Sequence, residues 1–137
     1  MLKKTIPYVD FDGNKRTEDF YFNLTESELI DWQTTTEGGM LTRLQTIVNS
    51  NDKPTIMRMF KEIILKSYGI KSDDGRRFEK SDAISTAFSQ TMAFNVLYQE
   101  LLGSENAGAD FINAILPPDL AKKLEQQESG KLLTPGI

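Results

Sequence analysis

The chain has 137 residues, a net charge of −4 and neither cysteine nor histidine. This length suits one domain, and the two absences exclude disulfides, a cysteine nucleophile, a Ser-His-Asp triad and the usual structural zinc sites. No run approaches the roughly 18 apolar residues that cross a bilayer, so no membrane partner is expected. The acidic balance, 20 Asp and Glu against 16 Lys and Arg, argues against binding of nucleic acid.

The first elements in the chain show the alternation of a β-hairpin over residues 4–22. A strong turn signal, Asp12-Gly13-Asn14, divides two short strands. On the return strand, Phe20 and Phe22 fall on one face. Pro7 has no N–H for a ladder hydrogen bond, so either the first strand lies at an edge of the sheet or the proline lies near the start of that strand.

Helical spacing of apolar residues begins after Leu24. Thr25 and Glu28 have the spacing of a capping box, which predicts a helix start at Glu26. Gly69 occupies the position typical of a glycine that ends a helix. Pro117-Pro118 stops a later one. The predicted helices are 26–34, 40–48, 54–68, 81–102, 106–116 and 119–127.

These elements predict an α+β, mainly helical fold, with the N-terminal β-hairpin packed on a bundle of five to six short-to-medium helices. Residues 1–128 are expected to form a single domain, with the hairpin at 4–22 and the helices within 26–127. The remaining residues, 129–137, have the composition of a flexible C-terminal tail.

No residue cluster has the pattern of a catalytic, cofactor or metal site. In the charged loop 71–80, placing Gly75 sixth in an EF-hand puts Ile70 first and Ser81 twelfth, and neither supplies the required carboxylate. Glu26 and Glu28 lie in a first helical turn, where acids cap the helix and complement its dipole. We therefore expect no cofactor and no enzymatic activity.

The hairpin carries the first candidates for partner binding. Tyr8 and Tyr21 are expected near the second face of the hairpin, the face that its own helices leave uncovered. An apolar second face would pack on another subunit, because a two-stranded hairpin is marginal alone. Packing of both tyrosines in the core of their own chain is the alternative.

Two further pairs of candidates come later in the chain. Arg76 and Arg77 lie in the charged loop, where they would contact an acidic partner or a phosphate, or would offset Asp73-Asp74 beside them. Leu132 and Leu133 are apolar residues in the predicted tail.

An ordered series of features over about residues 8–117 resembles the tail assembly chaperones of long-tailed, siphovirus-type bacteriophages. The series runs from the aromatic hairpin to a closing helix, and no single motif in it is specific. Its parts are Asp12-Gly13-Asn14, Leu24-Thr25, Ser67-Tyr68-Gly69-Ile70, Asp73-Asp74-Gly75-Arg76-Arg77-Phe78, Lys80-Ser81, the helix with Phe88, Thr91 and Tyr98, and Phe111-Ile112 with Leu116-Pro117.

The resemblance implies a non-enzymatic protein of the host cytoplasm that binds and solubilises the tape-measure protein during tail assembly. It also implies self-association into homo-oligomers, and it provides no catalytic residues. Two other functions stay open from the residues alone. One is another phage or bacterial adaptor, such as a head-tail connector or an inhibitor-type binder. The other is an enzyme that uses carboxylates and Mg²⁺.

Overall fold

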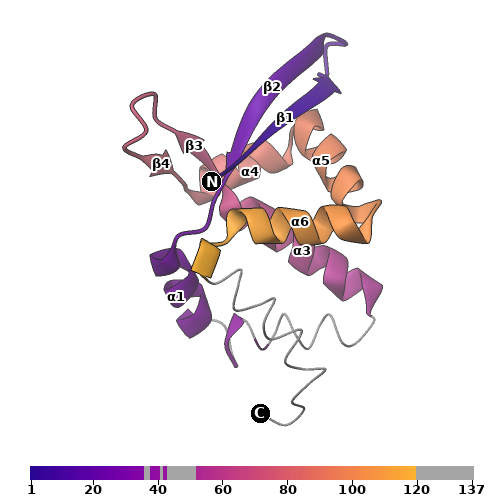
Figure 1. The fold of residues 1–137 in the computed structure, drawn as a ribbon. Helices are drawn as coiled ribbons and strands as arrows, with labels where there is room; N and C mark the ends of the chain where they lie inside the picture. The colour runs from indigo at the N-terminus through magenta and orange to yellow at the C-terminus, as the bar shows by residue number, and fades with distance from the viewer. Residues whose placement is uncertain (36–37, 41, 43–51, 120–137) are drawn as a thin grey trace.

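The structure is a computed structural model that describes residues 1–35, 38–40, 42 and 52–119. Over these residues the fold is α+β and mainly helical, as predicted: an antiparallel four-stranded sheet packs with five helices (Figure 1). The predicted helix at 40–48 lies mostly outside the described residues, as does the one at 119–127. The predicted tail, 129–137, lies wholly outside them.

The hairpin consists of β1 (Leu2–Val9) and β2 (Lys15–Phe22), paired in register from Leu2 opposite Phe22 to Val9 opposite Lys15. Its turn is held by Asp10, whose carboxylate accepts the backbone N–H groups of Asp12 and Asn14 at 3.0 and 2.9 Å. Gly13 has φ +84°, a conformation that glycine adopts without strain. The predicted hairpin is therefore confirmed.

The order of strands in the sheet is β1-β2-β3-β4, which confirms that β1 is an edge strand. The backbone N–H of Asp10 donates to the carbonyl of Asn14 at 2.9 Å, so these two residues form a hydrogen-bonded pair. Bonded and non-bonded pairs alternate along an antiparallel ladder, which makes Pro7 and Thr17 a non-bonded pair. The backbone nitrogen of Pro7 therefore points away from β2, so its lack of an N–H removes no hydrogen bond from the ladder.

The sheet continues through two strands that the sequence did not predict: β3 (Tyr68–Lys71) and β4 (Phe78–Glu79). Gly69 follows Tyr68, the C-cap residue of α3, as predicted, but it lacks the positive φ of a helix-ending glycine and pairs with β2 instead. It is required for another reason: a Cβ on Gly69 would lie 2.8 Å from the Phe78 ring and 2.9 Å from the Glu79 carbonyl oxygen. The predicted loop 71–80 is thus mostly the turn of a second hairpin, β3–β4.

Local side-chain caps define the starts of the helices. The side chains of Ser81, Thr91 and Ser104 each accept a backbone N–H three residues further on. Pro54 lies in the first turn of α3, as predicted. The described helices are α1 (Glu26–Thr35), α3 (Lys53–Ser67), α4 (Asp82–Ser89), α5 (Met92–Leu102) and α6 (Glu105–Ile115).

The long helix predicted over residues 81–102 is two helices, α4 and α5. Thr91 causes the break, because its hydroxyl donates to the Phe88 carbonyl at 2.7 Å and accepts the Phe94 N–H at 3.1 Å. The same side chain therefore ends one helix and caps the next. The apolar spacing continues across the break, which explains why periodicity predicted one helix.

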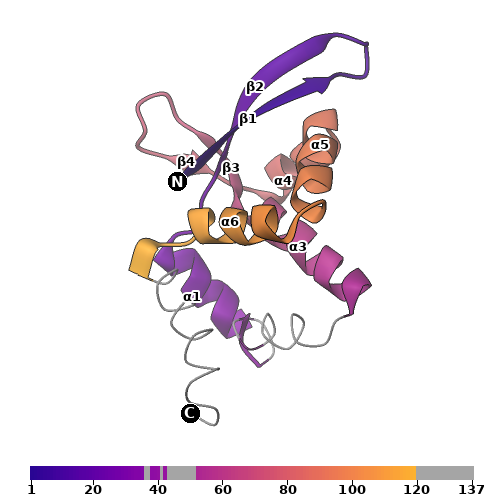
Figure 2. The same cartoon turned by 45° about the vertical axis from the view of Figure 1, so that its right-hand side comes forward.

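The core lies where the base of the hairpin meets α4, α5 and α6. Phe22 is at its centre, with ring centroids of Tyr68, Phe88 and Phe111 at 5.7, 5.7 and 5.3 Å. Tyr68 and Phe88 stack at 4.0 Å, joining β3 to α4. Toward its turn, the hairpin extends beyond the helices, as Figure 2 shows from a second direction.

Candidate functional site

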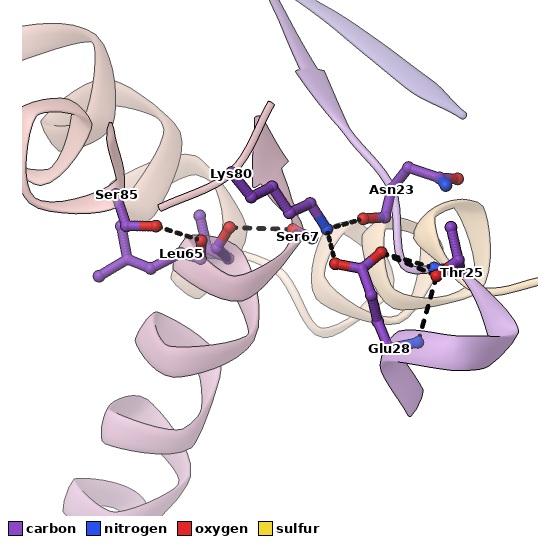
Figure 3. Close-up of polar contacts among 8 residues, drawn as sticks. Asn23, Thr25, Glu28, Leu65, Ser67, Lys80 and Ser85 are labelled. Carbon is purple, nitrogen blue, oxygen red and sulfur yellow. Dashed lines mark hydrogen bonds and ion pairs between the residues drawn. The ribbon is translucent and has the colours of Figure 1, made fainter. Parts of the chain in front are cut away.

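A partly buried lysine joins the second hairpin to the start of α1 (Figure 3). Lys80 follows β4 directly. Its Nζ donates to the backbone carbonyl of Asn23 and to the Glu28 carboxylate, both at 2.6 Å. Asn23 and Glu28 are 57 and 52 residues away in the sequence, so this joint is a tertiary contact that fixes the exit of β2 relative to α1.

Glu28 has a second role in the same joint. Its other carboxylate oxygen accepts the backbone N–H and the hydroxyl of Thr25, both at 3.0 Å, while the Thr25 hydroxyl accepts the Glu28 N–H at 3.2 Å. The predicted capping box is therefore confirmed. Both oxygens of this carboxylate therefore accept hydrogen bonds from groups of the same chain.

The charges in this joint oppose the effect of burial. Burial raises the pKa of Glu28, but the hydrogen bonds from Lys80 and Thr25 outweigh it and hold the pKa below its ordinary value. Burial lowers the pKa of Lys80, and the Glu28 carboxylate offsets only part of this. The pair is only partly buried, so solvent weakens its attraction, and its main effect is to satisfy the groups that folding has withdrawn from water.

Replacing Lys80 by methionine is expected to lower the free energy of unfolding by about 1–3 kcal/mol at neutral pH, because the Asn23 carbonyl and the Glu28 carboxylate lose their donor. Urea denaturation measures the loss, and Lys3→Met, at an exposed position on β1, is the control.

The difference between Lys80→Met and the unmodified protein should shrink in acid. The depressed pKa of Glu28 means that its charged form contributes fully above about pH 4.5, the ordinary glutamate value. That contribution is lost as the pH falls through the lower, folded-state value. A Lys80→Met protein as stable as the unmodified one at pH 7 would show that the joint contributes nothing.

Other buried polar groups near the joint are paired within the chain. The Ser67 hydroxyl donates to the Ile64 carbonyl at 2.9 Å, and the Ser85 hydroxyl donates to the Leu65 carbonyl at 3.1 Å (Figure 3). Within the described residues, no buried side-chain polar atom lacks a hydrogen-bond partner. The same part of the chain contains no group of three or more acidic residues placed to hold a metal ion.

The two candidate tyrosines do not share a face, which corrects the sequence interpretation. Tyr8 pairs with Arg16 in the ladder and lies on the inner face, with its ring 6.4 Å from that of Phe20 and its hydroxyl donating to Glu18. Tyr21 lies on the outer face, with the Lys71 ammonium 5.7 Å from its ring.

The outer face of the hairpin is also less apolar than predicted. Besides Tyr21, the register places mostly polar residues there: Lys3, Thr5, Pro7, Val9, Lys15, Thr17 and Asp19. The prediction of a second apolar face is therefore wrong. It grouped the aromatic residues of the two strands without the pairing register, which determines the face on which each side chain lies.

Arg76 and Arg77 lie at the turn of the β3–β4 hairpin with side chains 86% and 74% exposed. Carboxylates lie near both: Asp74 is 3.9 Å from Arg76, and Glu79 is 3.1 Å from Arg77. Contact of these arginines with a partner stays a prediction. Leu132 and Leu133 lie outside the described residues.

Exposed apolar side chains are the surface feature that the sequence analysis missed. Phe11 is 79% exposed at the hairpin turn, and Ile30 is 62% exposed on α1. Phe11 follows Asp10 in the turn, where strand alternation no longer decides which way a side chain points. The sequence Asp10-Phe11-Asp12-Gly13-Asn14 is typical of a turn that begins at an aspartate, and it would have placed Phe11 at the end of the hairpin.

The described residues define an α+β protein in which many charged groups take part in caps, turns and ion pairs, and several large apolar side chains are exposed. A sequence model of the phage tail assembly chaperone family matches residues 1–134, so the chain belongs to that family. No curated protein and no solved structure matches it. In the described ranges, no helix combines the length and apolar character needed to cross a membrane.

Proposed function

We propose that this protein binds the tape-measure protein of its phage in the host cytoplasm, keeps it soluble during tail assembly, and carries out no chemical reaction. The observation that carries this proposal is membership of the tail assembly chaperone family over residues 1–134. The family implies a protein client in the tail. The tape measure is the client whose physical properties create the need for a chaperone.

A tape-measure protein presents long amphipathic helices before the tail tube surrounds it. Exposed apolar surface of that kind drives aggregation. A chaperone meets this need by covering the surface transiently, and Phe11 and Ile30 are apolar groups of this chain available for such contacts. The candidate contacts Arg76 and Arg77 also have exposed side chains. Tyr8 and Tyr21 are both half-buried, Tyr8 beside Phe20 and Tyr21 beside Lys71.

Binding should bury apolar surface and depend little on charge. Calorimetric titration of the chaperone into a tape-measure fragment is therefore expected to give a negative heat-capacity change, and moderate salt should leave the affinity nearly unchanged. Truncation before Lys131 tests Leu132 and Leu133, and the Arg76→Ala/Arg77→Ala protein tests the hairpin turn. Absence of binding by the unmodified protein would refute the proposed client.

Self-association into homo-oligomers belongs to the same proposal. Its original reason, an apolar outer face of the hairpin, is removed by the observed register. A different feature of the hairpin supports it, namely the open edge of β2.

A further inference from the structure

The β2 strand has an open edge over most of its length. Only its last two residues, Tyr21 and Phe22, pair with β3. Beyond Gly69, β3 and β4 bend away from the hairpin, whereas α5 lies on the opposite side, beside β1 (Figures 1 and 2). Residues 15–19 of β2 are exposed, and no described strand pairs with them on this edge.

The backbone groups at this edge point outward at three alternate residues. Asp10 and Asn14 form a hydrogen-bonded pair, and every second pair along the ladder from there is also hydrogen-bonded. Lys15, Thr17 and Asp19 fall on the intervening pairs, so their backbone groups make no hydrogen bond to β1. The other end of β2 gives the same result. The backbone N–H of Asn23 donates to the Ser67 carbonyl at 2.8 Å, and the backbone groups of Tyr21, two residues earlier, also point toward β3. Lys15, Thr17 and Asp19 therefore direct their N–H and C=O groups to the open edge.

The charges along this edge change sign at Thr17, with basic residues before it and acidic residues after it. The sequence of residues 15–19 is Lys-Arg-Thr-Glu-Asp, two basic residues, a neutral centre and two acidic residues. When such a segment pairs with a second copy of itself in antiparallel register about its centre, Lys15 faces Asp19 and Arg16 faces Glu18, twice each. Opposite charges directly across a strand pair are favourable, and like charges are unfavourable.

We propose that β2 of one copy pairs with β2 of a second copy, antiparallel and centred on Thr17, to form a two-fold symmetric dimer. This inference gives a surface to the self-association proposed above and rests on that proposal, but it does not require the client. The occupant of the edge is a second copy because the charge order is complementary to itself. The two sheets become one continuous sheet across the dimer axis.

The pairing that brings opposite charges together also aligns the outward-pointing N–H and C=O groups of the two strands. Centring on Thr17 makes the pairs 15–19, 17–17 and 19–15 the hydrogen-bonded ones, and these are the residues with outward N–H and C=O groups. About six main-chain hydrogen bonds result. A register shifted by one residue in either direction would lose the hydrogen bonds and two of the four opposite-charge pairs.

The other edge of the hairpin is unsuited to the same contact. On β1, the outward-facing position at the middle of the strand is Pro7, which lacks a donor. Proline at this position blocks strand addition without weakening the hairpin. The chain therefore protects one edge and leaves the other, with its self-complementary charges, open.

Charge reversal at the outer pair tests the proposed register. Lys15→Glu and Asp19→Lys each place like charges opposite each other twice in the dimer, and each should raise the dimer dissociation constant roughly tenfold or more. An equimolar mixture of the two variants restores opposite charges at every position, so it should form the heterodimer. Lys3→Glu, on the same face but on β1, is the matched control and should dimerise normally.

Proline substitution tests the edge. Thr17→Pro removes the central outward N–H, and the hairpin itself loses no ladder hydrogen bond, as at Pro7. It should abolish the dimer. Val9→Pro places the same residue at an outward position on the β1 edge and should leave the dimer intact. Circular dichroism and thermal melting confirm that each variant is folded.

Sedimentation velocity over a range of concentrations supplies the readout, with an expected mass rising from 15.5 kDa toward twice that value. A chain that stays monomeric at every concentration, a dimer that survives Thr17→Pro, or a mixture of charge variants that fails to associate would overturn the inference. If the chain is monomeric yet still solubilises the tape-measure fragment, the dimer and the proposed self-association fail, and the proposed binding of the client stands.

Discussion

Replacing Phe22 by alanine is expected to lower the free energy of unfolding by about 3–5 kcal/mol. Phe22 is fully buried, and its ring contacts Tyr68 of β3, Phe88 of α4 and Phe111 of α6. The substitution leaves a cavity where the hairpin, the second hairpin and two helices meet. Because this is a large part of the stability of a small domain, the variant should be partly unfolded at moderate temperature.

Urea denaturation followed by circular dichroism measures this loss. Phe11→Ala is the matched control, since it removes the same ring from an exposed position and should change the stability by no more than about 0.5 kcal/mol. Equal midpoints for the two variants would contradict the assignment of Phe22 to the centre of the core.

Replacing Gly69 by alanine is expected to cost about 1–3 kcal/mol, even though it adds a single methyl group. The added Cβ would meet the Phe78 ring at 2.8 Å and the Glu79 carbonyl oxygen at 2.9 Å. The carbonyl belongs to the backbone of β4, so relief requires β3 and β4 to move apart. Amide hydrogen exchange at β3 and β4 should therefore increase in the variant.

Two comparisons isolate the close approach at Gly69. Ile70→Ala, at the neighbouring half-exposed position, should have a much smaller effect. The double variant Gly69→Ala/Phe78→Ala should be less impaired by the added methyl than the single variant, because the ring has gone. An alanine at position 69 that leaves both stability and exchange unchanged would mean that β3 and β4 are not packed as described.

Much of the fold could be predicted because its signals are local. The hairpin follows from strand alternation around Asp12-Gly13-Asn14, and the start of α1 follows from the spacing of Thr25 and Glu28. Each signal depends on residues a few positions apart, whose geometry is set by the backbone. The confirmed features are of this kind.

The second hairpin could not be predicted in the same way. β3 and β4 are short, and the charged residues between them have the composition of a loop. What makes strands of them is pairing with β2 and with each other, which is set by tertiary contact. The break at Thr91 was hidden for the opposite reason: the apolar period of a helix continues through it, and only the hydroxyl contacts reveal it.

The candidate site shows the same division. The joint at Lys80 unites residues more than 50 positions apart, so no local pattern announces it. The charge order of residues 15–19 can be read from the sequence, but it indicates an interface only once the structure shows that β2 has an open edge. Tyr8 and Tyr21 were grouped by type, and the ladder register separates them.

Solubility of the client on co-expression is the most direct test of the central claim. A tape-measure fragment from the same phage is expressed in bacteria alone, with this protein, and with the Phe22→Ala variant as a folding-defective control. We expect the fragment to be insoluble alone, to become soluble and co-purify with the unmodified protein, and to gain little from the variant. A fragment that is equally aggregated with and without the unmodified protein would contradict the proposed function.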